Sequence, residues 1–214
     1  MKMLRPLASF ALGLSLSISL PFPAFGYQYP LSSSAIREAY LSATEQNAAT
    51  PDFLAAYTHE FPSSDGPYVA SISVVTPYMK VFRRATKEAG YTSQDAVQYF
   101  LGKPATLRVE VTLQNVPSGF AATATQGELL QVPDTWHDYK VTLSQGGKRI
   151  EPADTSASLL VSDNAPNIAG VVVVAVVIAL EFDPENVGSV PTKISVTTPD
   201  GQRIKTKFDL SRLK

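Results

Sequence analysis

A run of apolar residues in the C-terminal part of the chain constrains its fold more than any other feature. Residues 169–182 read AGVVVVAVVIALEF, with no polar side chain from Ile168 to Leu180 and seven β-branched residues among the ten at 171–180. β-Branched side chains favour strands, and these 13 residues fall short of the roughly 20 that a membrane-spanning helix needs. We therefore predict a buried strand. Because apolar and polar residues do not alternate along it, we expect both of its faces to be covered.

The first 26 residues have the pattern of a secretory signal peptide. Lys2 and Arg5 precede an uncharged, mostly apolar stretch at 7–20, and small residues stand at Ala24 and Gly26, before Tyr27. This order of features predicts cleavage before Tyr27. We expect a periplasmic or secreted protein that is not integral to the membrane after signal cleavage. An uncleaved anchor is the alternative.

The net charge of the chain bears on its kind of partner, and its lack of cysteine bears on how its core is stabilised. The 19 acidic residues all follow residue 26 and the signal segment holds two of the 18 basic ones, so residues 27–214 carry a net charge of −3. A mildly acidic body argues against nucleic acid as a partner. The chain has no cysteine, so its core must be stable without disulfides, which 188 residues allow.

Cap and turn residues divide the mature chain into two parts. Residues 27–66 contain two short amphipathic patterns, capped by Ser34 and started by Thr50-Pro51, and are predicted to form an N-terminal helical segment. Residues 67–214 are predicted to form a β-sandwich domain with a helical insertion at 77–102. In that insertion Pro77 opens one helix, Ser93 caps the next, and Gly102 and Pro104 end it.

The rest of the domain has the spacing of antiparallel strands. Residues 107–113 alternate strictly, and glycine turns at 146–147 and 201 join two hairpins. Seven or eight short strands with a helix pair inserted after the first favour an immunoglobulin-like antiparallel β-sandwich, mainly β with helices. Within it, we expect Val174 or Val176 to be fully buried. We also expect the long strand to be covered by Phe82, Phe100 or Leu101 from the inserted helices.

Four stretches of the chain together resemble a family of exported bacterial proteins. They are YPLSSSAIREAY at 29–40, TPY at 76–78, WHDYKV at 136–141 and FDLSRL at 208–213. The resemblance spans nearly the whole mature chain. It implies one module rather than two separate domains, and it supplies no activity to transfer.

No arrangement of residues in the sequence identifies a reaction. Only His59 and His137 could assist a serine or threonine nucleophile, and no Gly-x-Ser-x-Gly elbow occurs. We interpret His59 as a solvated or capping residue. The segments 163–167 and 183–186 resemble calcium loops faintly and are interpreted as ordinary turns, so no metal ligand or cofactor is predicted.

The densest polar cluster follows the long connection at 115–136. Trp136 and His137, together with Phe120 in the connection, form the candidate binding loop, because long loops in compact domains are often functional. The structural alternative is that Trp136 plugs one end of the sandwich. Truncation to alanine distinguishes the two roles.

The expected function is therefore an exported, non-enzymatic binding or structural module of the bacterial envelope or exterior. An envelope protein or a polysaccharide is the expected kind of partner. The alternative is a secreted hydrolase or carbohydrate-active enzyme. We also expect a monomer, because Lys193, Arg203, Lys205 and Lys207 alternate with apolar residues in the last hairpin and discourage pairing between strand edges.

Overall fold

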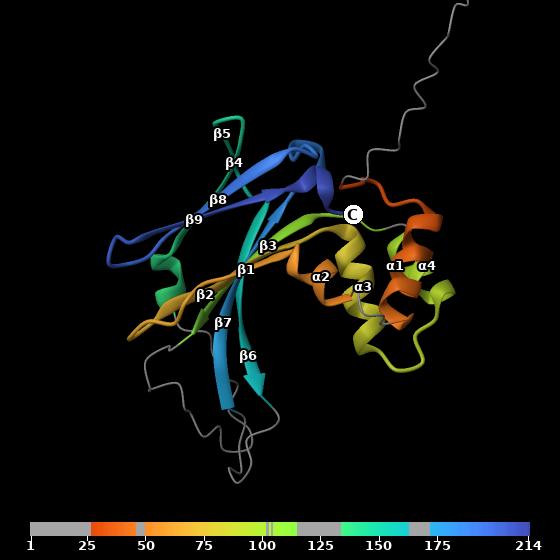
Figure 1. Cartoon of the computed structure of the whole chain (residues 1–214), viewed down its shortest axis with the longest axis horizontal. Helices are drawn as coiled ribbons and strands as arrows, with labels where there is room; N and C mark the ends of the chain where they lie inside the picture. Colours follow the sequence, from red (N-terminus) through yellow and green to blue (C-terminus); the bar gives the residue numbers. More distant parts are fainter. Residues whose placement is uncertain (1–26, 46–49, 102, 104, 115–133, 163–171) are drawn as a thin grey trace, which may run out of the picture.

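Two antiparallel sheets and four α-helices make up the computed structural model, which describes residues 27–45, 50–101, 103, 105–114, 134–162 and 172–214 (Figure 1). The five-stranded sheet has the order β1-β2-β3-β7-β6, and the four-stranded sheet has the order β5-β4-β8-β9. The strands are β1 Thr58–Glu60, β2 Tyr68–Val75, β3 Leu107–Gln114, β4 Lys140–Gln145, β5 Lys148–Ile150, β6 Asp154–Ser162, β7 Val172–Phe182, β8 Pro191–Thr197 and β9 Arg203–Asp209. This mainly β architecture is consistent with the predicted sandwich.

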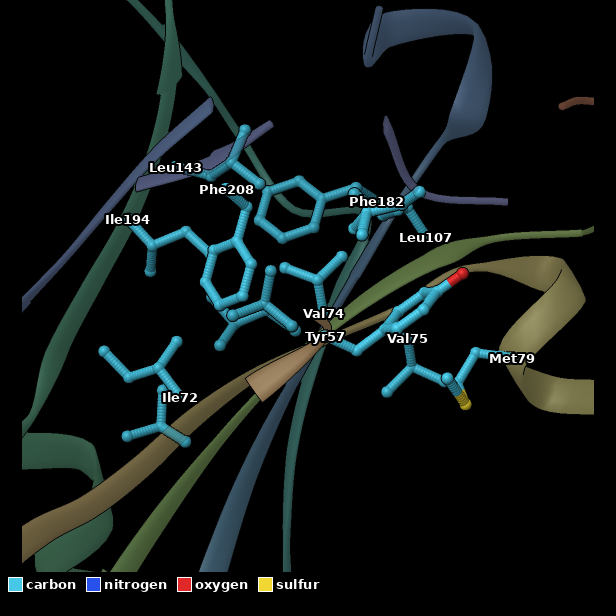
Figure 2. Packing of buried hydrophobic residues seen from close by; sticks show 14 of the residues in the cluster. Tyr57, Ile72, Val74, Val75, Met79, Leu107, Leu143, Phe182, Ile194 and Phe208 are labelled. Carbon is cyan, nitrogen blue, oxygen red and sulfur yellow. The ribbon is translucent and has the colours of Figure 1, made fainter. Parts of the chain in front are cut away.

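The main core lies between the two sheets. From β7, alternate residues point into it; these are Val176, Ile178, Leu180 and Phe182, each at most 3% exposed. Opposite them, the four-stranded sheet contributes Leu143, Ile194, Val196 and Phe208 (Figure 2). The burial predicted for the long apolar strand is therefore confirmed at Val176. The side chain of Val174 lies outside the described part.

The outer side of β7 carries small residues, namely Ala175, Val177 and Ala179, followed by Glu181. Ala175 is fully buried and Ala179 is 8% exposed, whereas Val177 is only partly buried, so most of this side is covered, as predicted. Of the three helical residues expected to contact the strand, Phe82 belongs to the main core together with Val176, whereas Leu101 is 58% exposed and Phe100 packs against a second, helical cluster.

The helices gather at one end of the five-stranded sheet, beside the end of β2 (Figure 1). They are α1 Ser33–Glu45, α2 Thr50–Ala55, α3 Pro77–Lys87 and α4 Ser93–Phe100. Helix α1 packs on α3 and α4 through a second apolar cluster of Leu31, Ala35, Ile36, Ala39, Tyr78, Val81 and Ala96. From the other side of α3, Met79 and Phe82 join the main core.

Local signals set the helix boundaries, with small shifts from the predicted ones. Thr76 caps α3 by accepting a hydrogen bond from the Met79 amide, and Pro77 occupies the first turn. Thr92, not Ser93, caps α4, and it forms a capping box with Asp95. At the start of α1, the hydroxyl of Ser32 rather than Ser34 accepts from the Ala35 amide.

One strand was not anticipated. Residues 58–60 lie in the segment predicted to be helical, yet they form β1 and pair with Ser71–Ser73 of β2. Three residues are too few for a periodicity signal, and pairing with an existing sheet edge decides their conformation. Among the described helices, none has the length and apolar character required to cross a membrane.

Candidate functional site

A groove of about 440 Å³ lies where α3 and α4 meet the outer face of the five-stranded sheet. We call it the basic groove. Its lining includes six cations, Lys80, Arg83, Arg84, Lys87, Lys103 and Arg108, together with Glu110, Tyr99 and Phe100. These six are all the lysines and arginines between Pro77 and Glu110. The fold therefore directs every basic residue of this stretch toward one hollow.

The spacing along α3 explains how four of these cations converge. Positions 80, 83, 84 and 87 follow the i, i+3, i+4, i+7 pattern, which places them along one side of a helix. The remaining sides of α3 are committed to apolar packing, with Tyr78 and Val81 in the helical cluster and Met79 and Phe82 in the main core. The charged side consequently faces the part of the sheet that carries Glu110 and Glu181.

A network of ion pairs forms the floor of the basic groove. The Lys80 ammonium lies 3.1 Å from a carboxylate oxygen of Glu181 and 2.6 Å from the Thr106 hydroxyl oxygen. Arg108, directly opposite Glu181 in the strand register, pairs with the same carboxylate. Arg83 reaches from α3 to Glu110 on β3 at 2.7 Å. These contacts join the helix to the outer face of the sheet.

The protonation states of the floor follow from this network. Burial raises the pKa of Glu181, but hydrogen bonds from Thr106 and Arg108 and the charge of Lys80 outweigh it, so the pKa lies below its usual value. Burial lowers the pKa of Lys80, and the neighbouring Glu181 partly offsets that effect. Glu181 is thus held as a carboxylate at neutral pH.

Three cations and one aromatic ring form the rim. The guanidinium carbon of Arg84 lies 3.6 Å from the ring centroid of Tyr99, and the Lys103 ammonium lies 3.3 Å from it. A hydrogen bond and the charge of Lys103, followed by those of Arg84, lower the pKa of Tyr99. Arg84 also pairs with Glu88 at 2.9 Å, while its buried Nε has no acceptor among the residues that the structure describes. Lys87 has neither a hydrogen bond nor an ion pair within the described residues.

The groove carries positive charge on a protein that is negative as a whole. Its six cations are offset by three carboxylates in or beside it, Glu88, Glu110 and Glu181, which leaves a net charge of +3. The whole chain has a net charge of −1. Such a concentration raises the local density of anions and speeds their association. Arginine and lysine donors in this arrangement suit phosphate, sulfate or carboxylate oxygens.

The residues that line the basic groove do not favour a role in covalent catalysis. Glu110 and Glu181 are both paired with cations, and neither histidine lies among the lining residues. No group of His, Asp or Glu side chains suited to a metal ion occurs in the described residues. The arrangement can therefore bind and orient an anion.

The predicted site residues lie elsewhere. Trp136 and His137 line a hollow of about 550 Å³ at the open side of the sandwich, between β4, β5 and β6. Their ring centroids are 3.7 Å apart with an interplanar angle of 30°, and Trp136 packs against the main core. Phe120 lies outside the described residues. The structure thus places Trp136 and His137 in the lining of the same hollow.

The other predicted positions have structural contacts. His59 packs edge-to-face on Phe208 at 4.6 Å, and its Nε2 lies 3.1 Å from the Lys207 carbonyl oxygen. Asp183 caps the 3-10 helix Pro184–Asn186 by accepting from the Glu185 amide. The loop 163–167 lies outside the described part. His59 and Asp183 both behave as stabilising residues of the scaffold.

Sequence reasoning did not find the basic groove, although one signal for it was present. Residues 27–192 contain ten lysines and arginines, and six of them fall within positions 80–108. Helical periodicity alone assigns such residues to a solvated face. The tertiary fold alone brings residues of α4 and of the strand from Leu107 beside α3 to complete the lining.

Comparison with protein-family models, curated proteins and solved structures yields no match to this chain.

Proposed function

We propose that this protein is an exported, non-enzymatic binding module that holds an anionic ligand in the basic groove. The observation that carries the proposal is the convergence of all six cations of residues 77–110 on one hollow. Export rests on the signal-peptide pattern of residues 1–26. The ligand would then be an anionic component of the envelope or exterior, for which a charged polysaccharide is one source.

A purely structural role explains only half of the groove. Lys80, Arg83 and Arg108 pair with Glu110 and Glu181, and they attach α3 to the sheet. The rim residues Lys87 and Lys103 attach no element to another through an ion pair in the described residues. Arg84 and Lys103, which both lie against the Tyr99 ring, repel each other, and a bound anion would relieve that repulsion.

The alternative of a secreted hydrolase receives less support. A general acid needs a carboxyl group that is protonated near neutral pH, which burial without a cation would favour. In the basic groove the pKa of Glu181 is lowered instead. An immunoglobulin-like layout of the two sheets, which we also propose, would agree with a role in recognition.

Charge reversal at the rim tests the proposal. Binding of inorganic phosphate and tripolyphosphate to the mature protein would be measured by calorimetry for the wild type and for the Lys87→Glu/Lys103→Glu variant. We expect the tripolyphosphate affinity to fall at least about tenfold, because two attractive contacts become repulsive. We also expect the wild-type affinity to fall with rising salt.

The matched control is Lys148→Glu/Arg149→Glu, which makes the same charge change in exposed residues of the β4–β5 hairpin. Its affinity should stay within about twofold of the wild type. Equal losses in both variants would show that only net charge matters. Absence of tripolyphosphate binding by the wild type at low salt would refute the proposal.

A further inference from the structure

A second hollow lies on the other side of α3 and shares one residue with the basic groove. It has a volume of about 460 Å³, and we call it the apolar hollow. Its lining residues are Thr50, Leu54, Tyr57, Thr58, Met79, Phe82, Arg83 and Thr86. Arg83 also lines the basic groove. The two hollows are therefore neighbours on two sides of α3.

The position of each residue around α3 determines which of the two hollows it lines, so that apolar residues line one and cations the other. Met79, Phe82 and Thr86 follow one line along the helix, whereas Lys80, Arg84 and Lys87 follow the adjacent line. Arg83 stands between the two lines. Its ion pair with Glu110 bridges helix and sheet at 2.7 Å, and 37% of its side chain remains exposed. The methylene stem of an arginine can lie along an apolar ligand while its guanidinium stays with a carboxylate.

The apolar hollow has walls suited to a hydrocarbon. The side chains of Tyr57, Met79 and Phe82 form its inner part, and all three are at most 3% exposed; Figure 2 shows Tyr57 and Met79 side by side. The Tyr57 hydroxyl donates to the Lys214 carbonyl oxygen at 3.1 Å, so its polar group is already satisfied. At the mouth Leu54 is 38% exposed, although it is a large apolar residue.

From this juxtaposition we infer that the ligand is an amphiphile. Its anionic head group would occupy the basic groove, and a short alkyl tail would pass Arg83 into the apolar hollow. This inference rests on the proposed function, since the head group uses the same cations. Charge complementarity favours an anionic head group, and the shared lining residue Arg83 places the apolar hollow next to that group, where an attached tail can enter it. A lipid and a free alkyl phosphate share this chemistry.

A ligand series measures the contribution of the tail. Calorimetry with the mature protein would use inorganic phosphate, butyl phosphate and octyl phosphate, each below its micelle concentration, with octyl glucoside as the uncharged comparison. We expect octyl phosphate to bind at least tenfold more tightly than inorganic phosphate, because burial of methylene groups adds to the head-group contacts. We expect octyl glucoside to bind more weakly than octyl phosphate. Vesicles of phosphatidylglycerol would then show whether a bilayer lipid competes.

Leu54→Asp places a carboxylate at the mouth of the apolar hollow. It should remove the preference for octyl over inorganic phosphate and leave inorganic phosphate binding within about twofold. Leu41→Asp is the matched control, because Leu41 is also an exposed leucine, at 50%, and lines neither hollow. Thr86→Glu, on the opposite wall, repeats the test through the same affinity ratio if Leu54→Asp unfolds.

The outcomes separate the two proposals. Equal affinities for inorganic and octyl phosphate, both lost in the Lys87→Glu/Lys103→Glu variant, would overturn the amphiphile and leave the anion site intact. An octyl preference unchanged by both Leu54→Asp and Thr86→Glu would place the tail elsewhere and would also overturn it. Failure of every phosphate to bind would overturn the proposed function itself.

Discussion

The two faces of the five-stranded sheet are formed by the same strands but present different kinds of side chain. The inner face presents valine, leucine, isoleucine and phenylalanine to the four-stranded sheet and forms the main core. The outer face presents serine, threonine, alanine and charged residues, and at one end it meets the cations of α3. One β-strand can serve both because successive side chains point to opposite sides. Stability is thus concentrated on one face, and the candidate site lies on the other.

Two adjacent valines of β7 provide the largest test of this comparison. Val176 is 1% exposed in the core, whereas Val177 is only partly buried on the outer face. Val176→Asp would bury an unpaired charge, which costs several kcal/mol. The free energy of unfolding of a typical protein is only about 5–15 kcal/mol, so the variant should fail to accumulate.

Val177→Asp is the matched control, since its carboxylate can reach solvent, and the protein should fold with a small loss of stability. Denaturant unfolding of both variants measures the difference. Similar losses at the two positions would mean that Val177 is as tightly enclosed as Val176.

Trp136→Ala tests how much Trp136 contributes to the main core. Trp136 is partly buried and packs against the main core, so truncation should cost about 2–3 kcal/mol, below the range for a fully buried tryptophan. Thermal unfolding with His137→Ala as the comparison would measure this loss. An unchanged midpoint for Trp136→Ala would instead favour Trp136 and His137 as ligand-binding residues.

Glu181→Gln tests the outer face and has the smallest expected effect on stability. Because the folded state lowers the pKa of Glu181, its ionised form stabilises the fold above the ordinary pKa of about 4.3, and this contribution is lost as the pH falls through the folded value. At pH 7 the variant should be destabilised by roughly 1–2 kcal/mol, since Lys80 and Arg108 lose a shared partner.

The difference between wild type and Glu181→Gln should shrink between about pH 5 and pH 3, as followed by thermal unfolding. Glu151→Gln is the control, because Glu151 is exposed and pairs with the exposed Arg149. A difference that stayed constant over this pH range would show that the Glu181 carboxylate contributes no ionic stabilisation.

Local patterns along the chain were sufficient for much of the fold. The alternation at 107–113, the proline and glycine signals around α3 and the turn at 199–201 predicted elements that the structure contains. β1 was missed because three residues carry no periodicity. Of the helical residues expected to contact β7, Phe82 joins the main core, whereas Leu101 is exposed because α4 packs against α1 rather than on the strand.

The candidate site was less accessible to sequence reasoning than the fold. Trp136 and His137 were singled out for composition and loop length, and the structure places them at one hollow. Arg84, Lys103 and Arg108 gave no comparable signal, because they belong to a helix, a turn and a strand whose packing brings them together. Only their density in the sequence pointed to them.

Periodicity, caps and turn residues thus determined, from the sequence alone, that this protein is mainly β, has two helices after the strand Tyr68–Val75 and buries Val176 in its core. They act through neighbours within a few positions, so they can be read along the chain. The tertiary structure alone decided which face of each element meets which partner. The basic groove and the apolar hollow arise because α3 packs at one end of the sheet with its charged side toward β3, and the Arg83–Glu110 contact joins residues more than 20 positions apart.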